Sequence, residues 1–118
     1  MSQVDLDIEV TREAGGIPVI RLEGEVDIYT CPQLKDTIIR LIDEGCYHIV
    51  IDMSKVPYID SAGLGVLVGA RRRVGEHDGS ISIVNPNPSV FKVLEITRLT
   101  KIFDVYQDKE GALAAAAA

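Results

Sequence analysis

The sequence predicts an α/β fold: a mainly parallel sheet with an N-terminal antiparallel hairpin and about four helices. Three observations lead there. Strand-like and helix-like segments alternate along most of the chain. The run Tyr47–Met53 is almost continuously apolar, as in a strand covered on both faces. The first twenty-odd residues read as two strands joined by a glycine turn. With 118 residues, 47% of them hydrophobic, we expect one domain spanning residues 1–118.

The hairpin is predicted from residues 4–10 and 17–22. Apolar and polar residues alternate strictly from Val4 to Val10, so the three acids in this segment should face water. Ala14-Gly15-Gly16 forms the turn. Pro18 cannot donate to a strand ladder, so it belongs at a strand start or a free edge.

The first helix should begin near Thr30. Thr30 and Gln33 fit a capping box, in which each side chain bonds to the backbone N–H of the other residue. One apolar stripe follows, made of Leu34, Ile38, Leu41 and Ile42. Gly45 is expected to end the helix.

The central strand, residues 47–53, is followed by a loop that contains Pro57 and then by the second half of the chain. Asn87 should cap a helix whose first residue is Pro88. The elements expected are a helix over 61–76, a strand over 81–84, a helix from Pro88 through Thr97, a strand over 102–106 and a terminal helix from Asp108.

Composition and charge argue against several functions. Lys and Arg number 12 against 18 Asp and Glu, a net charge of −6, which disfavours binding to nucleic acid. Arg71-Arg72-Arg73 would fan around a helix, so a solvated surface is favoured over a contact site for an acidic partner. No apolar run is long enough to span a bilayer, and the N-terminus lacks a basic secretory signal. We therefore expect a cytoplasmic protein without membrane contact.

No metal or cofactor site is predicted. Cys31 and Cys46, the only cysteines, lack metal-ligand spacing and are interpreted as ordinary reduced thiols. His48 falls within a strand, where its ring should be packed, and His77 lies near a polar turn without a partner at ligand spacing.

The helix after Asp60 contains an unusual number of glycines. Gly63, Gly65 and Gly69 all fall inside it, and each interior glycine costs about 1 kcal/mol relative to alanine. Close packing against the sheet would explain them, and so would the approach of a partner from the exposed side. The sequence favours the first explanation without excluding the second.

Three kinds of functional site are considered for the residues around Ser61: a nucleotide-binding site, a hydrolase site and a phosphorylation site. The segment Gly63–Gly69 is one residue longer than a dinucleotide-binding fingerprint, and no phosphate-loop lysine follows. Ser61 lacks the preceding glycine of a hydrolase nucleophile elbow. Ser61 lies where a loop enters a helix. This position fits an ordinary helix start, and it also fits a phosphorylation site at which another protein transfers the phosphate. From the residues alone the plain helix start is favoured.

A longer pattern changes this balance. The segment YIDSAGLGVLVGARR, residues 58–72, resembles the signature of the STAS domain in bacterial anti-sigma factor antagonists. The segments GEVDIYT, HIVIDMSKVPYIDSAGLG and ISIVNPNPSVFKVLEITRL resemble other parts of the same family, so the likeness covers nearly the whole chain.

In that family the serine after the aspartate is phosphorylated, and the matching residue is Ser61. Ala62 stands where the family often has a second hydroxyl, which leaves Ser61 as the local acceptor. Arg98 stands where the family usually has glycine, so either a left-handed helix end there is strained or the turn differs from the family's.

The resemblance implies partner switching. The unphosphorylated domain would bind an anti-sigma factor with serine kinase activity and so release the sigma factor. Phosphorylation of Ser61 would separate the two proteins, and a metal-dependent serine phosphatase would reset the switch. The domain itself would have no enzymatic activity and no catalytic residues. A non-switching STAS scaffold, or an interaction module of a larger signalling assembly, is the alternative.

The resemblance also indicates where the partner binds. Asp60 should cap the helix, and Asp27 either takes part in kinase recognition or caps its own loop. Val56, Tyr58, Ile59 and Leu64 would supply apolar contacts, unless two of them belong to the core. The partner-binding residues expected are Asp27, Tyr58, Ile59, Asp60, Ala62, Gly63, Leu64 and Gly65.

Overall fold

A computed structural model describes residues 5–117, in which five strands form one mixed sheet in the order β1-β2-β3-β4-β5. β1 and β2 are antiparallel, and the other neighbouring strands are parallel. The predicted α/β fold class is therefore confirmed. Val4, where the first strand was expected to begin, lies outside the described residues. The strands are β1 (Asp7–Arg12), β2 (Pro18–Glu23), β3 (His48–Lys55), β4 (Ser80–Val84) and β5 (Asp104–Tyr106).

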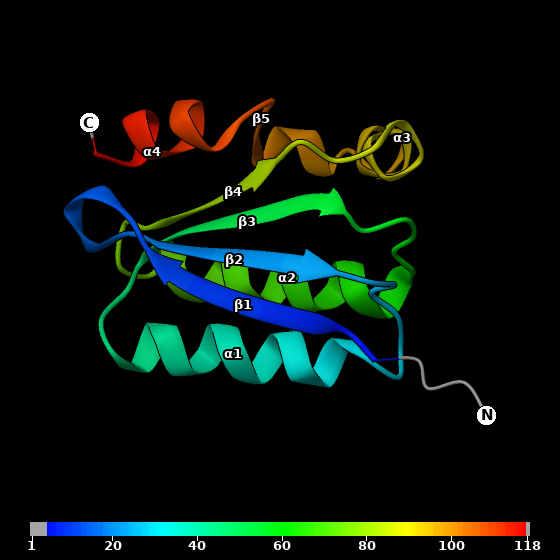
Figure 1. The fold of residues 1–118 in the computed structure, drawn as a ribbon, viewed down its shortest axis with the longest axis horizontal. Coiled ribbons are helices and arrows are strands. Elements are labelled where there is room, and N and C mark those ends of the chain that lie inside the picture. The colour runs from blue at the N-terminus through cyan, green and yellow to red at the C-terminus, as the bar shows by residue number, and fades with distance from the viewer. Residues whose placement is uncertain (1–4, 118) are drawn as a thin grey trace.

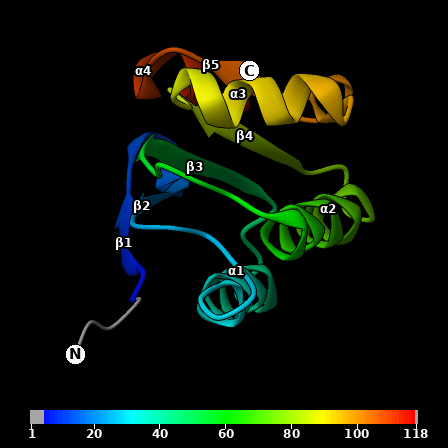
Figure 2. The ribbon, with the colours of Figure 1, turned by 90° about the vertical axis from the view of Figure 1, so that its right-hand side faces the viewer.

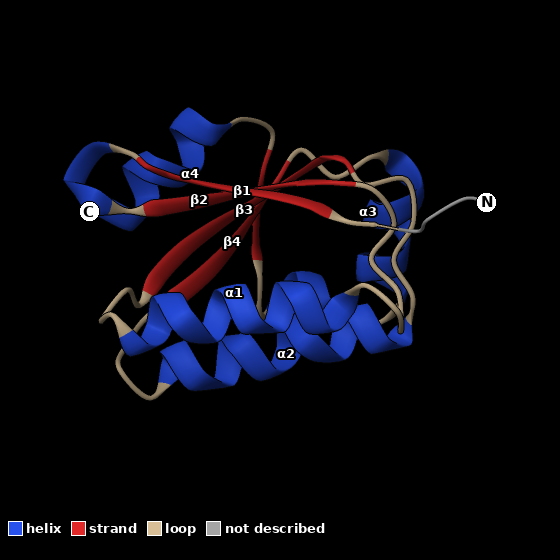
Figure 3. Cartoon of the chain, turned by 60° about the horizontal axis from the view of Figure 1, so that its bottom comes forward, coloured by secondary structure: helices blue, strands red, loops and turns tan. Residues whose placement is uncertain are grey.

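Four α-helices connect and follow these strands in the described part of the chain. They are α1 (Cys31–Asp43), α2 (Ser61–Gly75), α3 (Pro88–Ile96) and α4 (Lys109–Ala117). The helices α1 and α2 lie next to each other along one face of the sheet, as Figures 2 and 3 show. The helix α4 lies against the other face (Figure 1).

The central strand β3 contributes side chains to two hydrophobic cores, one on each face of the sheet. Ile49, Ile51 and Met53 pack into the main core with side chains of α1 and α2. Val50 points to the opposite face and packs with Ala112 of α4. Alternate residues of one strand are thus buried on both sides, which explains the nearly continuous apolar run.

The predicted capping box at Thr30 is wrong. Thr30 does precede the first residue of α1, but no side-chain cap hydrogen bond joins it to the described helix. Its hydroxyl instead donates to the carbonyl oxygen of Glu25 at 2.8 Å and accepts from the backbone N–H of Asp27 at 3.0 Å. The buried hydroxyl is therefore used by the loop before the helix.

Two predictions about strand positions also need correction. His48 is exposed rather than packed, because it is the first residue of β3, and its Nδ1 lies 3.0 Å from the hydroxyl of Ser80. β5 begins at Asp104, because a short 3₁₀ turn occupies Leu99–Lys101. Phe103, just before this strand, is buried in the main core.

Two of the predicted helix ends are as expected. The side-chain oxygen of Asn87 accepts a hydrogen bond from the backbone N–H of Val90 at 2.8 Å, so Asn87 caps α3. After α3, Arg98 adopts a left-handed conformation with φ of 63°. Glycine takes this conformation at no steric cost, whereas arginine does not. Within residues 5–117 no helix is both long and apolar enough to cross a bilayer.

Candidate functional site

The site forms where the parallel strands β2 and β3 end and the helices α1 and α2 begin, at the right-hand end of Figure 1. Two loops run alongside each other there: the first loop, residues 24–30, and the second loop, residues 56–60. The backbone N–H of Val26 donates to the carbonyl of Tyr58 at 3.0 Å, and that of Asp60 donates to the carbonyl of Val26 at 3.1 Å. A parallel bridge also pairs Val26 with Ile59. The sheet pairing therefore continues into the loops and fixes the start of α2.

Asp60 joins the two loops to the helix. One carboxylate oxygen accepts a hydrogen bond from the backbone N–H of Gly63 at 3.0 Å, which confirms the predicted cap. The other oxygen accepts from the backbone N–H of Ile28 at 3.1 Å. Both oxygens are thus engaged with backbone donors, and a single side chain sets the relative position of the first loop and α2.

Asp27 organises the first loop. Its Oδ1 accepts hydrogen bonds from the backbone N–H groups of Tyr29 and Thr30 at 2.9 and 3.0 Å. The hydroxyl of Thr30 lies 3.2 Å from the same oxygen. Of the two roles left open by the sequence, the structure supports the loop cap, and a role in kinase recognition stays a prediction.

Ser61 is the first residue of α2, and its side chain is exposed. The first N–H groups of a helix have no intrahelical acceptor and lie at the positive end of the helix dipole. Asp60 satisfies one of these groups, that of Gly63. The hydroxyl of Ser61 is therefore accessible to another protein, at a place where the helix backbone favours an added negative charge.

Three exposed hydrophobic side chains belong to the two loops. Ile28 is 63% exposed, Tyr29 81% and Tyr58 51%. We call these three residues the exposed rim of the site. Ile28 and Tyr29 were not named as partner-binding residues from the sequence, because an apolar pair before a helix looks the same whether it is buried or exposed. The signal available was their place directly after the loop-capping Asp27.

The remaining apolar candidates divide between core and surface. Val56 and Ile59 are buried in the main core, while Leu64 is only partly buried and packs against it. This matches the alternative in which two of the four belong to the core. Ile59 can therefore act on a partner only through the shape of the second loop.

The glycines of α2 have two different explanations. A Cβ on Gly63 would lie 2.7 Å from a side-chain carbon of Val26 and 2.9 Å from its carbonyl oxygen. Gly63 thus lets the helix approach the first loop. A Cβ on Gly65 or Gly69 would meet no heavy atom of the described chain within 4 Å. Close packing within the domain explains Gly63 but not the other two.

A thiol lies under the site. Cys31, the first residue of α1, is buried, and that burial raises the pKa of its thiol, with the negative charges of Asp60 and Asp27 adding to the effect. Burial and the two carboxylates thus disfavour the thiolate, which is the reactive form of cysteine. In residues 5–117 no group of three His, Cys, Asp or Glu side chains lies close enough together to hold a metal ion.

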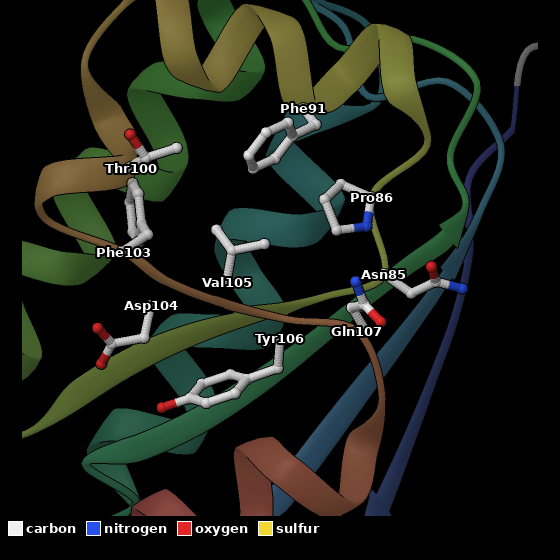
Figure 4. A pocket seen from close by; sticks show the side chains of 9 residues that line it. All are labelled: Asn85, Pro86, Phe91, Thr100, Phe103, Asp104, Val105, Tyr106 and Gln107. Carbon is white, nitrogen blue, oxygen red and sulfur yellow. The ribbon is translucent and has the colours of Figure 1, made fainter.

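A hollow of about 730 Å³ lies elsewhere, at the β5 edge of the sheet (Figure 4). Phe91 and Val105 line it together with the amides of Asn85 and Gln107. It is larger than the groove beside α2 described below, but it contains no residue of either loop or of α2. It is therefore separate from the site around Ser61.

The comparisons with known proteins agree on one family. Residues 9–112 match the family model of the STAS domain. The chain is 30% identical to an anti-sigma F factor antagonist of Paenibacillus polymyxa over 93% of this chain and 94% of that protein. It is 31% identical to an anti-sigma-B factor antagonist of Bacillus subtilis (strain 168), over 92% of this chain and 97% of that one.

A solved structure agrees in fold. The crystal structure of an anti-sigma factor antagonist from Mycobacterium paratuberculosis superposes with a TM-score of 0.86 and 27% identity, covering 96% of this chain and 95% of that chain. The chain therefore belongs to the STAS domain family. These three relatives are anti-sigma factor antagonists by name, as the resemblance of residues 58–72 predicted.

Proposed function

We propose that this protein is an anti-sigma factor antagonist that is switched off by phosphorylation of Ser61. In its unphosphorylated form it binds an anti-sigma factor that is also a serine kinase, and the bound sigma factor is released. A metal-dependent serine phosphatase restores the unphosphorylated form. The protein supplies the docking surface and the acceptor hydroxyl, and its partners supply the chemistry.

One observation carries the proposal: an exposed serine at the first position of a helix, next to three exposed hydrophobic side chains. Large exposed hydrophobic residues gathered at one place mark interaction sites, and tyrosine is enriched among residues that dominate binding energy. Ile28, Tyr29 and Tyr58 therefore serve as the contact surface. The names of the relatives, which cover nearly the whole chain, support the class of partner.

The carboxylates of Asp27 and Asp60 act by holding this surface in shape. Because Asp60 bonds both to Gly63 and to Ile28, it fixes the exposed rim relative to the hydroxyl of Ser61. A phosphate on Ser61 adds about −1.5 to −2 charges at pH 7. Once a partner excludes water, the repulsion between this charge and nearby carboxylates is screened far less than in the free protein. Phosphorylation therefore opposes docking more strongly than it opposes folding.

The experiment is a release assay with purified components. A complex of the sigma factor and its serine-kinase anti-sigma factor, both from the same genome, is mixed with this protein, and free sigma factor is measured. We expect release by the unphosphorylated protein, and loss of release after incubation with ATP and Mg²⁺. Ser61→Ala should continue to release the sigma factor with ATP present.

Two outcomes would contradict the proposal. If no sigma factor is released at any concentration, the protein is not an antagonist of that anti-sigma factor. If wild-type protein and Ser61→Ala release it equally with and without ATP, the domain binds without switching, as the scaffold alternative requires.

A further inference from the structure

A groove runs between α1 and α2, beside the site but distinct from the two loops. It has a volume of about 560 Å³. Figures 2 and 3 show the two helices side by side on one face of the sheet. Residues of both helices line the groove. From Ala62 to Glu76 it follows α2 for about 20 Å, given a rise of about 1.5 Å per residue.

Small and apolar residues form part of the lining of this groove, which we call the α1/α2 groove. Gly65, Val66 and Gly69 of α2 line it together with Ile38 and Ile39 of α1. Neither glycine is required by internal packing, since a Cβ at either would meet no described atom within 4 Å. Both lower the intrinsic stability of the helix. What they provide is room for another backbone to come close.

The edge of the groove is basic, although the chain as a whole is acidic. Lys35, Arg72 and Arg73 line it, and Glu76 stands at the far end. Among residues 5–117 none of these three cations takes part in an ion pair. Arg71 differs, because it does not line the groove and instead donates a hydrogen bond to the carbonyl of Ile102 at 3.1 Å. The three consecutive arginines are therefore not equivalent.

The groove is continuous with the phosphorylation site. Ala62, which follows Ser61 in the chain, forms its near end. A partner that contacts the exposed rim of the site thus has the groove directly beside it. Standard interfaces bury about 800 Å² on each partner, which is more than three exposed side chains provide.

We propose that the α1/α2 groove receives an acidic amphipathic helix of the anti-sigma factor. Its small or apolar side chains lie over Gly65 and Gly69, and its carboxylates pair with Lys35, Arg72 and Arg73. This inference rests on the proposed function, since it takes the partner from there. It adds the groove to the contact surface that the exposed rim provides, and it assigns the choice of partner to the groove.

The test compares binding variants by titration with the purified anti-sigma factor, without ATP. Gly69→Leu places a large side chain in the groove, and leucine also favours the helical conformation. The double variant R72E/R73E reverses the charge at the edge of the groove. The double variant K92E/K101E reverses two exposed cations outside the groove and is the matched charge control. We expect each groove variant to bind at least tenfold more weakly than wild type, and K92E/K101E to bind within twofold of it.

Two further readouts separate docking from folding. Thermal unfolding of Gly69→Leu should occur no lower than that of wild type, because the groove is open at that position. Wild-type affinity should fall as salt is raised, and R72E/R73E should show a smaller salt dependence. If Gly69→Leu does not fold, the charge-reversed variant and the salt series still decide the question.

The outcomes distinguish this inference from the proposed function. If wild-type protein binds and both groove variants bind equally well, the groove is not the docking site, while the proposed function stands. If the groove variants instead alter only the self-association of the protein in sedimentation, a second copy occupies the groove and the inference is wrong. If wild-type protein does not bind the anti-sigma factor at all, the proposed function fails and this inference fails with it.

Discussion

The starts of α2 and α3 are built alike. Each helix follows a parallel strand, and each begins after a side chain that accepts a hydrogen bond from the backbone N–H of the third helical residue: Asp60 from Gly63 at 3.0 Å, Asn87 from Val90 at 2.8 Å. Each cap also reaches a neighbouring loop. Asp60 accepts from the backbone N–H of Ile28, and the amide of Asn87 donates to the carbonyl of Val56 at 2.8 Å.

The two starts differ in what surrounds them. Ser61 is the first residue of α2, whereas α3 begins with Pro88 and has Ser89 second. Both serines are exposed. The exposed rim belongs to the loops around α2, while the exposed Ile96 lies at the far end of α3. Capping geometry alone therefore does not define a functional site, and Ser89 is an internal control for every claim about Ser61.

The kinase should phosphorylate Ser61 and not Ser89. With the serine-kinase anti-sigma factor, ATP and Mg²⁺, we expect wild-type protein and Ser89→Ala to incorporate phosphate, and Ser61→Ala to incorporate none. Phosphopeptide mapping measures this directly. Label that persists in Ser61→Ala would mean that the exposed rim does not select the acceptor.

An acidic substitution should weaken binding of the anti-sigma factor at Ser61 but not at Ser89. Ser61→Asp is expected to weaken binding of the anti-sigma factor at least tenfold, about 1.4 kcal/mol, because it adds charge beside Asp60 within the interface. Ser89→Asp should bind within twofold of wild type. Aspartate carries less charge than phosphate, so the effect is smaller than that of phosphorylation. Equal weakening by both substitutions would point to a general charge effect.

At the third helical position, opposite changes in side-chain size should destabilise the two starts. Gly63→Ala places a methyl group 2.7 Å from Val26, so we expect a loss of about 1–3 kcal/mol in the free energy of unfolding. Val90 fills the corresponding space at α3 and is buried, so Val90→Gly should destabilise by creating a cavity. Gly65→Ala, with open space around it, is the control and should stabilise by up to about 1 kcal/mol. Urea unfolding checks all three variants.

Removing the caps should have similar effects at both starts. Asp60→Ala and Asn87→Ala each remove a cap and a link to a neighbouring loop, and about 1–2 kcal/mol of unfolding free energy should be lost in each case. Binding should distinguish them, because only Asp60 holds Ile28. An Asn87→Ala variant that binds the anti-sigma factor as poorly as Asp60→Ala would undermine this difference.

The smallest expected effect is that of phosphorylation on folding. The helix dipole favours a phosphate on Ser61 by roughly 0.3–1 kcal/mol, and repulsion from the carboxylate of Asp60 offsets this by a similar amount. The free energy of unfolding should change by no more than about 1 kcal/mol. Amide NMR shifts should be confined to the second loop and the first turn of α2. Shifts that extend to Ile49 and Ile83 in the sheet would instead indicate a conformational switch.

The sequence predicted those features that depend on local patterns. The antiparallel hairpin, the apolar run of β3 and the Asn87-Pro88 helix start each have a short-range signature, and the structure confirms them. The strict alternation predicted up to Val10 is wrong at its end, because Val10 is 39% exposed. The prediction of a capping box at Thr30 was wrong because its hydroxyl has other hydrogen-bond partners nearby. In the structure it bonds within the first loop, to the carbonyl oxygen of Glu25 and the carboxylate of Asp27, and not to the helix.

The site needed long-range information. The pairing of Val26 with Ile59 joins residues far apart in the chain, and it decides that Ile59 is buried while Ile28, Tyr29 and Tyr58 stay exposed. No local pattern contains this. In the same way, only the position of α2 against the first loop distinguishes Gly63, which packs on Val26, from Gly65 and Gly69, which have open space around them.

The most direct test of the switch is the affinity of the anti-sigma factor for the protein with and without phosphate on Ser61. Isothermal titration of both forms, without ATP, gives the two dissociation constants. We predict that phosphorylation weakens binding more than a hundredfold, about 3 kcal/mol, with the fold unchanged. Dissociation constants that agree within a factor of two would contradict the account.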